Sequence, residues 1–219
     1  MNKYLRIYEL LRPALQKQRW WPTHSKNPQL EICLGAILTQ NTNWRNVEKA
    51  LSSLIKEDLI DAGKIKSIST KTLSMLIKPS GCYNQKAKKL KEFCGFAAGR
   101  YNGDMNTLFS LSAEELRKKL LKINGVGNET ADSIMLYAAK KPVFVVDAYT
   151  KRIFSRLGLI KETEPYEEVQ KKFMDHLPKN AALFSSFHAL LVEHGKQFCR
   201  KKPLCSSCPL KKVCNQTFK

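Results

Sequence analysis

Four cysteines near the C-terminus have the spacing of a metal site. They follow the pattern Cys199-x5-Cys205-x2-Cys208-x5-Cys214, with basic residues and two prolines between them. Four thiolates suit either a structural zinc ion or a [4Fe–4S] cluster. Two close pairs of cysteines would favour zinc, but only one close pair is present. The residues therefore predict a metal centre of one of these two kinds.

A second pattern, Gly125-Val126-Gly127-Asn128, predicts a sharp turn between two helices. Two glycines one residue apart permit positive φ and a close approach of another group to the backbone. Asn128 is expected to cap the following helix, so that several N–H groups point out of the turn together. Such a turn binds anions, and a DNA phosphate fits it. The alternative is a plain helical corner with a glycine C-cap.

A carboxylate, Asp147, follows the short apolar run from Val143 to Val146 and stands at the start of an expected helix. A carboxylate can stabilise developing positive charge, and it can orient or deprotonate a water molecule. It can also be an ordinary N-cap, and the two roles are compatible.

Helices must position these residues, because apolar side chains recur at helical spacing and the run 143–146 is too short and isolated to form a sheet. We therefore expect an all-α protein. A capping box at Ser112-Ala113-Glu114-Glu115 opens the helix that leads into the glycine turn. The other helices are expected at residues 4–18, 29–39, 47–55, 68–77, 85–100, 128–140, 150–156, 166–176 and 181–197.

The charge balance indicates a polyanionic partner. The 219-residue chain has 38 Lys and Arg against 19 Asp and Glu, which gives a net charge of +19 and a pI near 9.7. No long apolar span or basic amphipathic anchor is present, so a membrane partner is not expected. Lysines 86, 88, 89 and 91 give the helix at 85–100 a basic face, which either contacts DNA or is merely solvated.

The cysteine usage indicates a reducing compartment. Seven cysteines, an odd number with four at one end, suit metal binding rather than disulfides. The segment from Met1 to Leu15 is charged throughout and carries no secretory signal. We expect a cytoplasmic, nucleoid-associated protein, in which Cys33, Cys82 and Cys94 are buried apolar residues.

The hairpin segment Ile123–Ala131, which reads I-N-G-V-G-N-E-T-A, resembles that of the helix-hairpin-helix DNA glycosylases of the endonuclease III superfamily. That family places an apolar run and a catalytic aspartate about 20 residues further on, which matches Val143 to Asp147. The segment Gly35–Thr42 and the four cysteines extend the resemblance from about Trp20 onward.

The resemblance implies a two-lobed, endonuclease III-like fold. A helical barrel domain would span residues 28–140 and end in the hairpin at about 114–140. A discontinuous domain would join residues 1–27 to 141–219 and carry the catalytic aspartate and the cluster loop 199–214. The family carries a [4Fe–4S] cluster with spacing x6, x2, x5, and the first gap here is one residue shorter. The cluster's implied role is structural.

The resemblance also implies roles in excising a damaged base from double-stranded DNA, by a protein that we expect to be a monomer. The base is flipped into a pocket, and Asp147 stabilises the positive charge that develops on the sugar. The hairpin residues Gly125 to Asn128 bind a DNA phosphate. Gln40 enters the duplex where the flipped base left, although a plain helix cap and turn is the alternative reading of its segment.

One departure from the family pattern concerns strand cleavage. Bifunctional members have a lysine where this chain has Glu129, and that amine forms a Schiff base with the sugar. A carboxylate cannot do so, which predicts a monofunctional glycosylase without AP lyase activity. Glu129 can also simply favour the N-terminus of its helix.

Within the superfamily, the segments Trp20-Trp21-Pro22, L-T-Q-N-T and G-V-G-N-E-T-A-D resemble the type III 3-methyladenine glycosylases. A cationic alkylated purine would then be held by the aromatic faces of Trp20, Trp21 and Trp44. The adjacent tryptophans could instead pack between domains.

Two other functions remain open. One is an endonuclease III-like glycosylase, with or without lyase activity, for oxidised pyrimidines or mismatched thymine or uracil. The other is a non-catalytic DNA-binding module.

Overall fold

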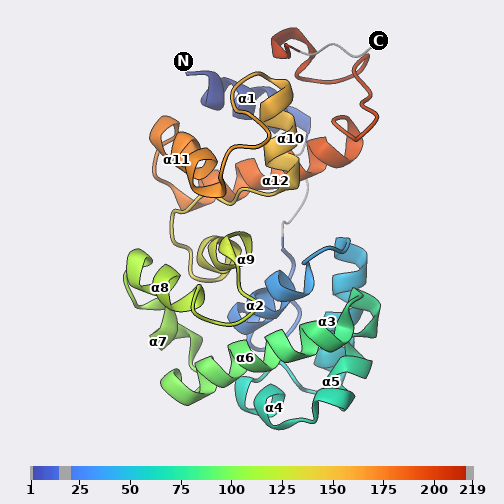
Figure 1. Ribbon diagram of the computed structural model, residues 1–219, viewed down its shortest axis with the longest axis vertical. Helices are drawn as coiled ribbons and strands as arrows, with labels where there is room; N and C mark the ends of the chain where they lie inside the picture. The colour runs from blue at the N-terminus through green and yellow to red at the C-terminus, as the bar shows by residue number, and fades with distance from the viewer. Residues whose placement is uncertain (1, 15–20, 216–219) are drawn as a thin grey trace. The chain divides into compact units, whose positions relative to one another are not determined.

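The computed structural model describes residues 2–14 and 21–215, and their regular structure is helical, with no β-strand among them (Figure 1). The expectation of an all-α protein is therefore confirmed. Trp20 lies outside the described residues. None of the helices within these two ranges is both long and apolar enough to cross a membrane.

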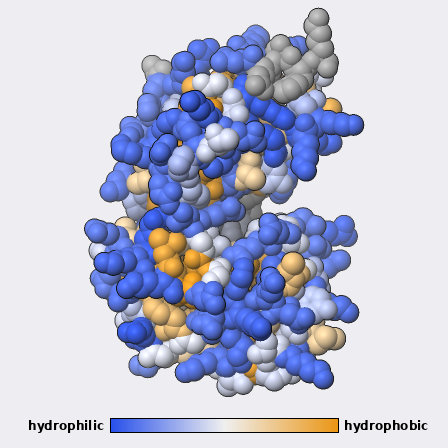
Figure 2. Space-filling view, viewed as in Figure 1, coloured by the Kyte–Doolittle hydropathy of each residue, from blue (hydrophilic) through white to orange (hydrophobic). Residues whose placement is uncertain are grey.

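The chain divides into two compact units. Unit 1 combines Met1–Trp20 with Pro142–Lys219, and unit 2 is the continuous segment Trp21–Lys141. The borders therefore fall at 20/21 and 141/142, whereas the sequence predicted 27/28 and 140/141. The face seen in Figure 2 is predominantly hydrophilic, in keeping with a chain in which 26% of the residues are charged.

Unit 2 is built around α2 (Pro28–Leu38), in which every residue from Leu30 to Leu38 is buried. Helices α3, α6 and α9 and the turn η3 pack around it. An apolar helix surrounded in this way forms the centre of a core. The elements of unit 2 that follow α2 are α3 (Trp44–Lys56), α4 (Ala62–Ser67), α5 (Thr70–Leu76), η2 (Lys78–Ser80), α6 (Tyr83–Tyr101), α7 (Met105–Phe109), α8 (Ala113–Leu120), α9 (Asn128–Ser133) and the π-helical turn η3 (Ile134–Ala138).

Unit 1 joins the two ends of the chain around an aromatic core. Its elements are α1 (Lys3–Leu11), η1 (Arg12–Ala14), α10 (Ala148–Arg156), α11 (Tyr166–His176), α12 (Ala181–Gln197) and η4 (Lys211–Val213). Phe144 and Phe173 stack with ring centroids 4.0 Å apart, and Phe154 and Phe187 surround them. Tyr4 of α1 completes this core through ring contacts with Phe154 and Phe173.

Three sequence expectations need correction. The helix expected at 4–18 ends at Leu11 and continues as a 3-10 turn that contains Pro13, while residues 15–18 lie outside the described ranges. A proline at this point removes a backbone donor and prevents a regular continuation. Cys33 and Cys94 are buried as expected, but Cys82 is exposed, because it stands in the left-handed turn before α6.

The third correction concerns the basic face of α6. Lys88 is exposed, but Lys86 is buried, and its Nζ donates to the carbonyl oxygens of Leu38 at 2.8 Å and Ser80 at 2.6 Å. Desolvation by burial lowers the pKa of Lys86. This amine therefore binds carbonyl groups at the ends of two other helices, where a cation is favourable, and is not available to DNA.

Candidate active site and metal centre

The glycine turn connects α8 to α9 in unit 2, and its two glycines serve different purposes. Gly125 has a φ of +88°, and a Cβ there would stand 2.3 Å from Cγ of Lys89. Gly127 has an ordinary φ of −92°, and a Cβ there would meet no atom of the described residues within 4 Å. Gly125 is thus required by the fold itself, whereas Gly127 leaves open space beside the backbone, as a bound phosphate would need.

The capping role expected for Asn128 is wrong. Gly127 is the N-cap of α9 and provides no side-chain cap, while Asn128 is already the first helical residue. Its Oδ1 accepts a hydrogen bond from Nη2 of Arg117 at 3.2 Å. Arg117 also forms an ion pair of 2.8 Å with Asp132, whose side chain is completely buried. This clamp from α8 to α9 fixes the angle at which the two helices of the hairpin meet.

Gln40, just beyond the C-terminal end of α2, is hydrogen-bonded to the hairpin. Its Nε2 donates to the carbonyl oxygen of Gly125 at 3.0 Å and to Oγ1 of Thr130 at 2.9 Å. Its Oε1 accepts from Nζ of Lys89 at 2.5 Å. We call Gln40, Lys89, Gly125 and Thr130 the hairpin network. Gln40 was singled out from the sequence, but nothing in the spacing of Lys89 indicated this contact.

Three aromatic side chains of unit 2 form an aromatic cluster. Trp21 meets the ring of Trp44 edge-on, with centroids 5.3 Å apart, and lies 4.7 Å from the ring of Tyr137 at an angle of 32°. Nε1 of Trp21 is buried and has no hydrogen-bond partner among the described residues. A Cβ at Gly35 would stand 3.2 Å from this nitrogen, so the glycine allows the indole to lie against α2. Trp21 and Trp44 were expected at the site, whereas Tyr137 was missed.

Two local features hold the aromatic cluster in place. Tyr137 belongs to the π-helical turn η3, a type of irregularity that often occurs at functional sites. Glu31 of α2 is 1% exposed, and its carboxylate accepts backbone N–H groups of His24 and Ser25, three and four residues after Trp21. The buried carboxylate thereby anchors the loop that carries Trp21. Neither feature has a signature in the sequence.

Asp147 lies in unit 1 at the N-cap of α10, where its Oδ1 accepts the N–H of Thr150 at 2.7 Å. The extended segment that leads to it is held by α11. Nε2 of Gln170 donates to the carbonyl oxygen of Phe144 at 2.6 Å, and the N–H of Val146 donates to the hydroxyl of Tyr166 at 3.3 Å. These contacts fix the backbone just before Asp147, so the carboxylate has a defined position.

The charge of Asp147 is set by burial and by one histidine. Its Oδ2 lies 3.6 Å from Nε2 of His188 on α12, and the two side chains are 11% and 7% exposed. Burial raises the pKa of Asp147, but His188 and the N–H of Thr150 outweigh burial, so the pKa lies below its ordinary value. We call Asp147, Thr150 and His188 the aspartate site. His188 stands 41 positions from Asp147 in the sequence and was not predicted.

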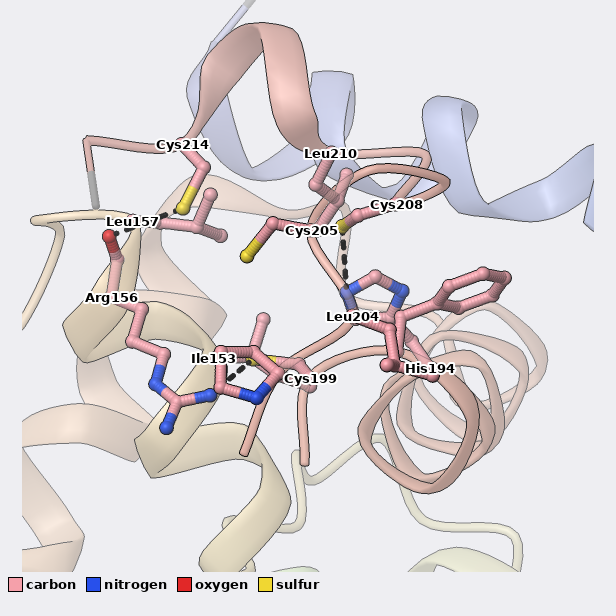
Figure 3. A pocket seen from close by; sticks show the side chains of 12 residues that line it. Ile153, Arg156, Leu157, His194, Cys199, Leu204, Cys205, Cys208, Leu210 and Cys214 are labelled. Carbon is pink, nitrogen blue, oxygen red and sulfur yellow. Dashed lines mark hydrogen bonds between the residues drawn. The ribbon is translucent and has the colours of Figure 1, made fainter. Parts of the chain in front are cut away.

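The four cysteines of the C-terminal pattern line one pocket of unit 1 (Figure 3). The rest of its lining is mostly apolar and includes Ile153, Leu157, Phe198, Leu204 and Leu210. Burial and the neighbouring thiols of the other three cysteines raise the pKa of the Cys208 thiol. Four thiolates in an apolar pocket repel one another unless a cationic centre binds them. The donor set therefore fits a thiolate-ligated centre, although no described group of three or more His, Cys, Asp or Glu side chains is arranged to hold a metal ion.

Helix α10 connects the aspartate site to the cysteine loop. Asp147 caps its first turn, and two arginines further along bind the loop that begins at Cys199. Nε of Arg152 donates to the carbonyl oxygen of Cys199 at 2.8 Å. Nη1 of Arg156 donates to Sγ of Cys199 at 3.3 Å and to the carbonyl oxygen of Arg200 at 2.7 Å. Disorder in the loop would therefore also disturb α10, the helix that carries Asp147.

The sequence matches a known protein family. Residues 34–179, a span that includes the hairpin and Asp147, match the HhH-GPD superfamily of base excision DNA repair proteins. The chain belongs to this family. Since its relatives include endonuclease III proteins, it is a base excision repair DNA glycosylase of the endonuclease III family.

Individual relatives cover almost the whole chain. A protein of Methanocaldococcus jannaschii named "Putative DNA repair glycosylase MJ1434" is 47% identical, over 97% of both chains. The endonuclease III of Thermotoga maritima is 32% identical, over 95% of this chain and 92% of its own. The structure of the Helicobacter pylori 3-methyladenine DNA glycosylase MagIII bound to 1,N6-ethenoadenine superimposes with a TM-score of 0.78. It is 32% identical and is matched over 90% of this chain and 98% of its own.

Proposed function

We propose that this protein is a monofunctional DNA glycosylase that removes alkylated purines such as 3-methyladenine from double-stranded DNA and acts as a monomer. The aromatic cluster of Trp21, Trp44 and Tyr137 is the observation that carries the choice of substrate. The similarity to MagIII over almost the full length of both chains supports the same choice. Trp20, which we also expect at this pocket, lies outside the described residues.

The aromatic cluster suits a cationic base. Alkylation at a ring nitrogen leaves the purine positively charged, and electron-rich aromatic faces attract cations. Such a base is already a good leaving group, so the pocket requires no acid to protonate it. Trp21 and Trp44 provide faces in an edge-on pair, and Tyr137 contacts Trp21 from the side of η3. Discrimination then comes from the charge of the base rather than from hydrogen bonds to its edges.

Asp147 performs the chemistry in this proposal. When the bond between base and sugar breaks, positive charge develops on the sugar, and a nearby carboxylate lowers the energy of that state. The contacts with His188 and Thr150 keep Asp147 ionised at neutral pH despite its burial. The same carboxylate can orient the water molecule that attacks the sugar. Its N-cap contact is compatible with both tasks.

Glu129 supports the assignment of a monofunctional enzyme. It lies exposed in the first turn of α9, at the position where bifunctional members of the family carry their lysine. A carboxylate cannot form a Schiff base with the sugar, so the product is an abasic site in an unbroken strand. The residue also favours the N-terminus of its helix by its charge.

The hairpin would bind the DNA backbone. Val126, Gly127 and Asn128 present the turn and the N-terminus of α9, whose N-cap residue Gly127 provides no side-chain cap. Gln40 would enter the duplex in place of the flipped base. To do so it must exchange its three hydrogen bonds to Gly125, Thr130 and Lys89 for contacts with DNA.

Cys199, Cys205, Cys208 and Cys214 would hold a [4Fe–4S] cluster, which supplies cross-linking of the C-terminal loop. The shared pocket of the four cysteines supports this ligand set. Protein prepared without oxygen should contain iron and sulfide and absorb broadly near ~400 nm. The variant Cys205→Ser should lose both elements, and stoichiometric zinc in the wild type would contradict the assignment.

The proposed activity is tested with duplexes that each carry a single lesion: 3-methyladenine, an oxidised pyrimidine, or thymine or uracil opposite guanine. Released base and strand breaks are measured with and without alkali after incubation. We expect release from the alkylpurine duplex and breakage only after alkali. Preference for an oxidised or mismatched pyrimidine would reassign the substrate, and breakage without alkali would reassign the mechanism. Binding to all duplexes with release from none would indicate a non-catalytic module.

A further inference from the structure

His188 is an ion-pairing partner of Asp147. Its Nε2 lies 3.6 Å from Oδ2, within ion-pair distance and slightly longer than a hydrogen bond. The residue belongs to α12, which packs directly on α10. Both side chains are nearly buried. Catalytic hydrogen bonds are often long in substrate-free enzymes and shorten in the complex.

The two oxygens of the Asp147 carboxylate are held from two different helices. Oδ1 accepts the N–H of Thr150 within α10, and Oδ2 faces His188 of α12. Two contacts of this kind fix the plane of the carboxylate, whereas the Thr150 contact alone leaves it free to turn about the bond to Oδ1. We propose that His188 is a positioning residue, which holds Asp147 in the orientation and charge state that base release requires. This inference rests on the catalytic role proposed for Asp147.

The electrostatic balance at Asp147 supports this assignment. Burial raises the pKa of the carboxyl group, and it is the strongest single influence. His188 lowers this pKa through its side-chain contact and its charge, and Thr150 lowers it further. Without His188, burial would be less strongly opposed, and the pKa of Asp147 would rise. The ionised form would then be lost at a higher pH than in the wild type.

Several titratable groups on the surrounding elements have partners elsewhere. On α10, Lys151 donates to the carbonyl oxygen of Glu164. On α12, Glu193 pairs with Lys196 and His194 lies against Cys208. Two tyrosines are engaged as well: the hydroxyl of Tyr166 on α11 accepts the N–H of Val146, and Tyr149 on α10 faces the guanidinium of Arg152. A change at His188 therefore acts on Asp147 more directly than a change at any of these groups.

The test compares His188→Phe, which removes the donor, with His188→Gln, whose amide can still reach Oδ2. The control is His176→Gln, which removes an exposed histidine of the same unit. Single-turnover release of 3-methyladenine is measured from pH 4.5 to 8, together with affinity for the lesion duplex. His188→Phe should be slower by about tenfold or more, because small displacements of a catalytic group are costly. Unlike the wild type, it should lose further rate toward the acid end of this range while its affinity is unchanged. His188→Gln should recover part of the rate, and the control should match the wild type.

A wild-type rate and a wild-type pH profile in folded His188→Phe would overturn the inference. If circular dichroism shows that this variant does not fold, His188→Asn replaces it, since its shorter amide does not reach Oδ2, and the same changes are expected. Asp147→Asn is measured in parallel. An active Asp147→Asn enzyme would refute the catalytic role of Asp147 itself. An inactive one beside a normal His188→Phe enzyme would refute only the role of His188.

Discussion

The aspartate site and the hairpin network hold their polar groups in different ways. Asp147 and His188 are nearly buried, and α11 fixes the backbone that leads to Asp147. In the hairpin network, the side chains of Gln40 and Lys89 are only half-buried, and they bind one another and the hairpin. A buried charge with fixed partners suits the stabilisation of a transition state. Half-exposed polar contacts can be exchanged for contacts with a ligand. The comparison therefore supports our proposal that the aspartate site performs the chemistry and that the hairpin network binds DNA.

The largest effect is expected at the aspartate site. Asp147→Asn keeps the size of the side chain and an oxygen that can accept the N–H of Thr150, but it removes the charge. Base release should fall by ~10²-fold or more, since one preorganised electrostatic partner is commonly worth that much. Affinity for lesion DNA should change little. Single-turnover kinetics and a binding titration on the same duplex measure both quantities. An equal loss of affinity and rate would contradict the division between chemistry at the aspartate site and DNA binding at the hairpin network.

The two glycines of the hairpin separate folding from binding. Gly125→Ala forces a side chain into the left-handed region and against Lys89, so it should destabilise the protein by roughly 1–2 kcal/mol. Gly127→Ala meets no described atom, so it should lower stability less than Gly125→Ala, through the weaker preference for alanine at an N-cap alone. It should nevertheless weaken DNA binding by about tenfold, because a backbone contact with phosphate is worth roughly that much. If Gly127→Ala binds DNA with wild-type affinity, this turn does not contact a phosphate.

Two neighbouring lysines of α6 provide a matched pair with the same loss of charge. Lys89→Met removes the donor to Gln40 and should lower stability by about 1 kcal/mol, the usual net value of a hydrogen bond. Lys88→Met changes an exposed residue and should leave stability within about 0.5 kcal/mol of the wild type. Thermal unfolding measures both variants. If the two melt alike, the contact between Lys89 and Gln40 does not contribute to the hairpin network.

The smallest expected effect is the response of the wild type to acid. The pKa of Asp147 is held below its ordinary value of 3.8, so the carboxylate stays ionised until the pH falls below that value. Its contribution to activity is then lost only as the pH falls through the lowered pKa. Base release should therefore vary little between pH 8 and about pH 5 as far as Asp147 is concerned. A rate that halves near pH 6 in the wild type, but not in Asp147→Asn, would contradict the low pKa.

The features predicted correctly from the sequence follow from local rules. Asp147 precedes a helix and caps it, and Gly125 adopts the positive φ that a sharp turn requires. The cysteines of the C-terminal pattern line one pocket, since their spacing confines them to a single loop. The predicted N-cap at Asn128 was wrong by one position, because the helix begins at that residue instead of after it. Helix ends are the least certain part of any sequence-based assignment.

The missed residues depend on contacts between distant elements. His188 approaches Asp147 only because α12 packs on α10, and Tyr137 reaches Trp21 from an irregular turn of helix. Lys86 and Lys89 appeared in the sequence as part of a solvated or DNA-binding face. Their amines are occupied by the carbonyl groups of Leu38 and Ser80 and by the side chain of Gln40. Spacing along a chain gives the face of a helix, but not what lies against that face.

The central claim is that a carboxylate of the aspartate site, and no amine of the hairpin region, performs the chemistry. Borohydride trapping on an alkylpurine duplex tests it most directly, because borohydride converts a Schiff base into a permanent link between protein and DNA. Wild-type protein should release the base and give no cross-linked species, while an endonuclease III with its lysine intact is trapped under the same conditions. Efficient trapping of the wild type would show that an amine attacks the sugar, and would contradict the claim.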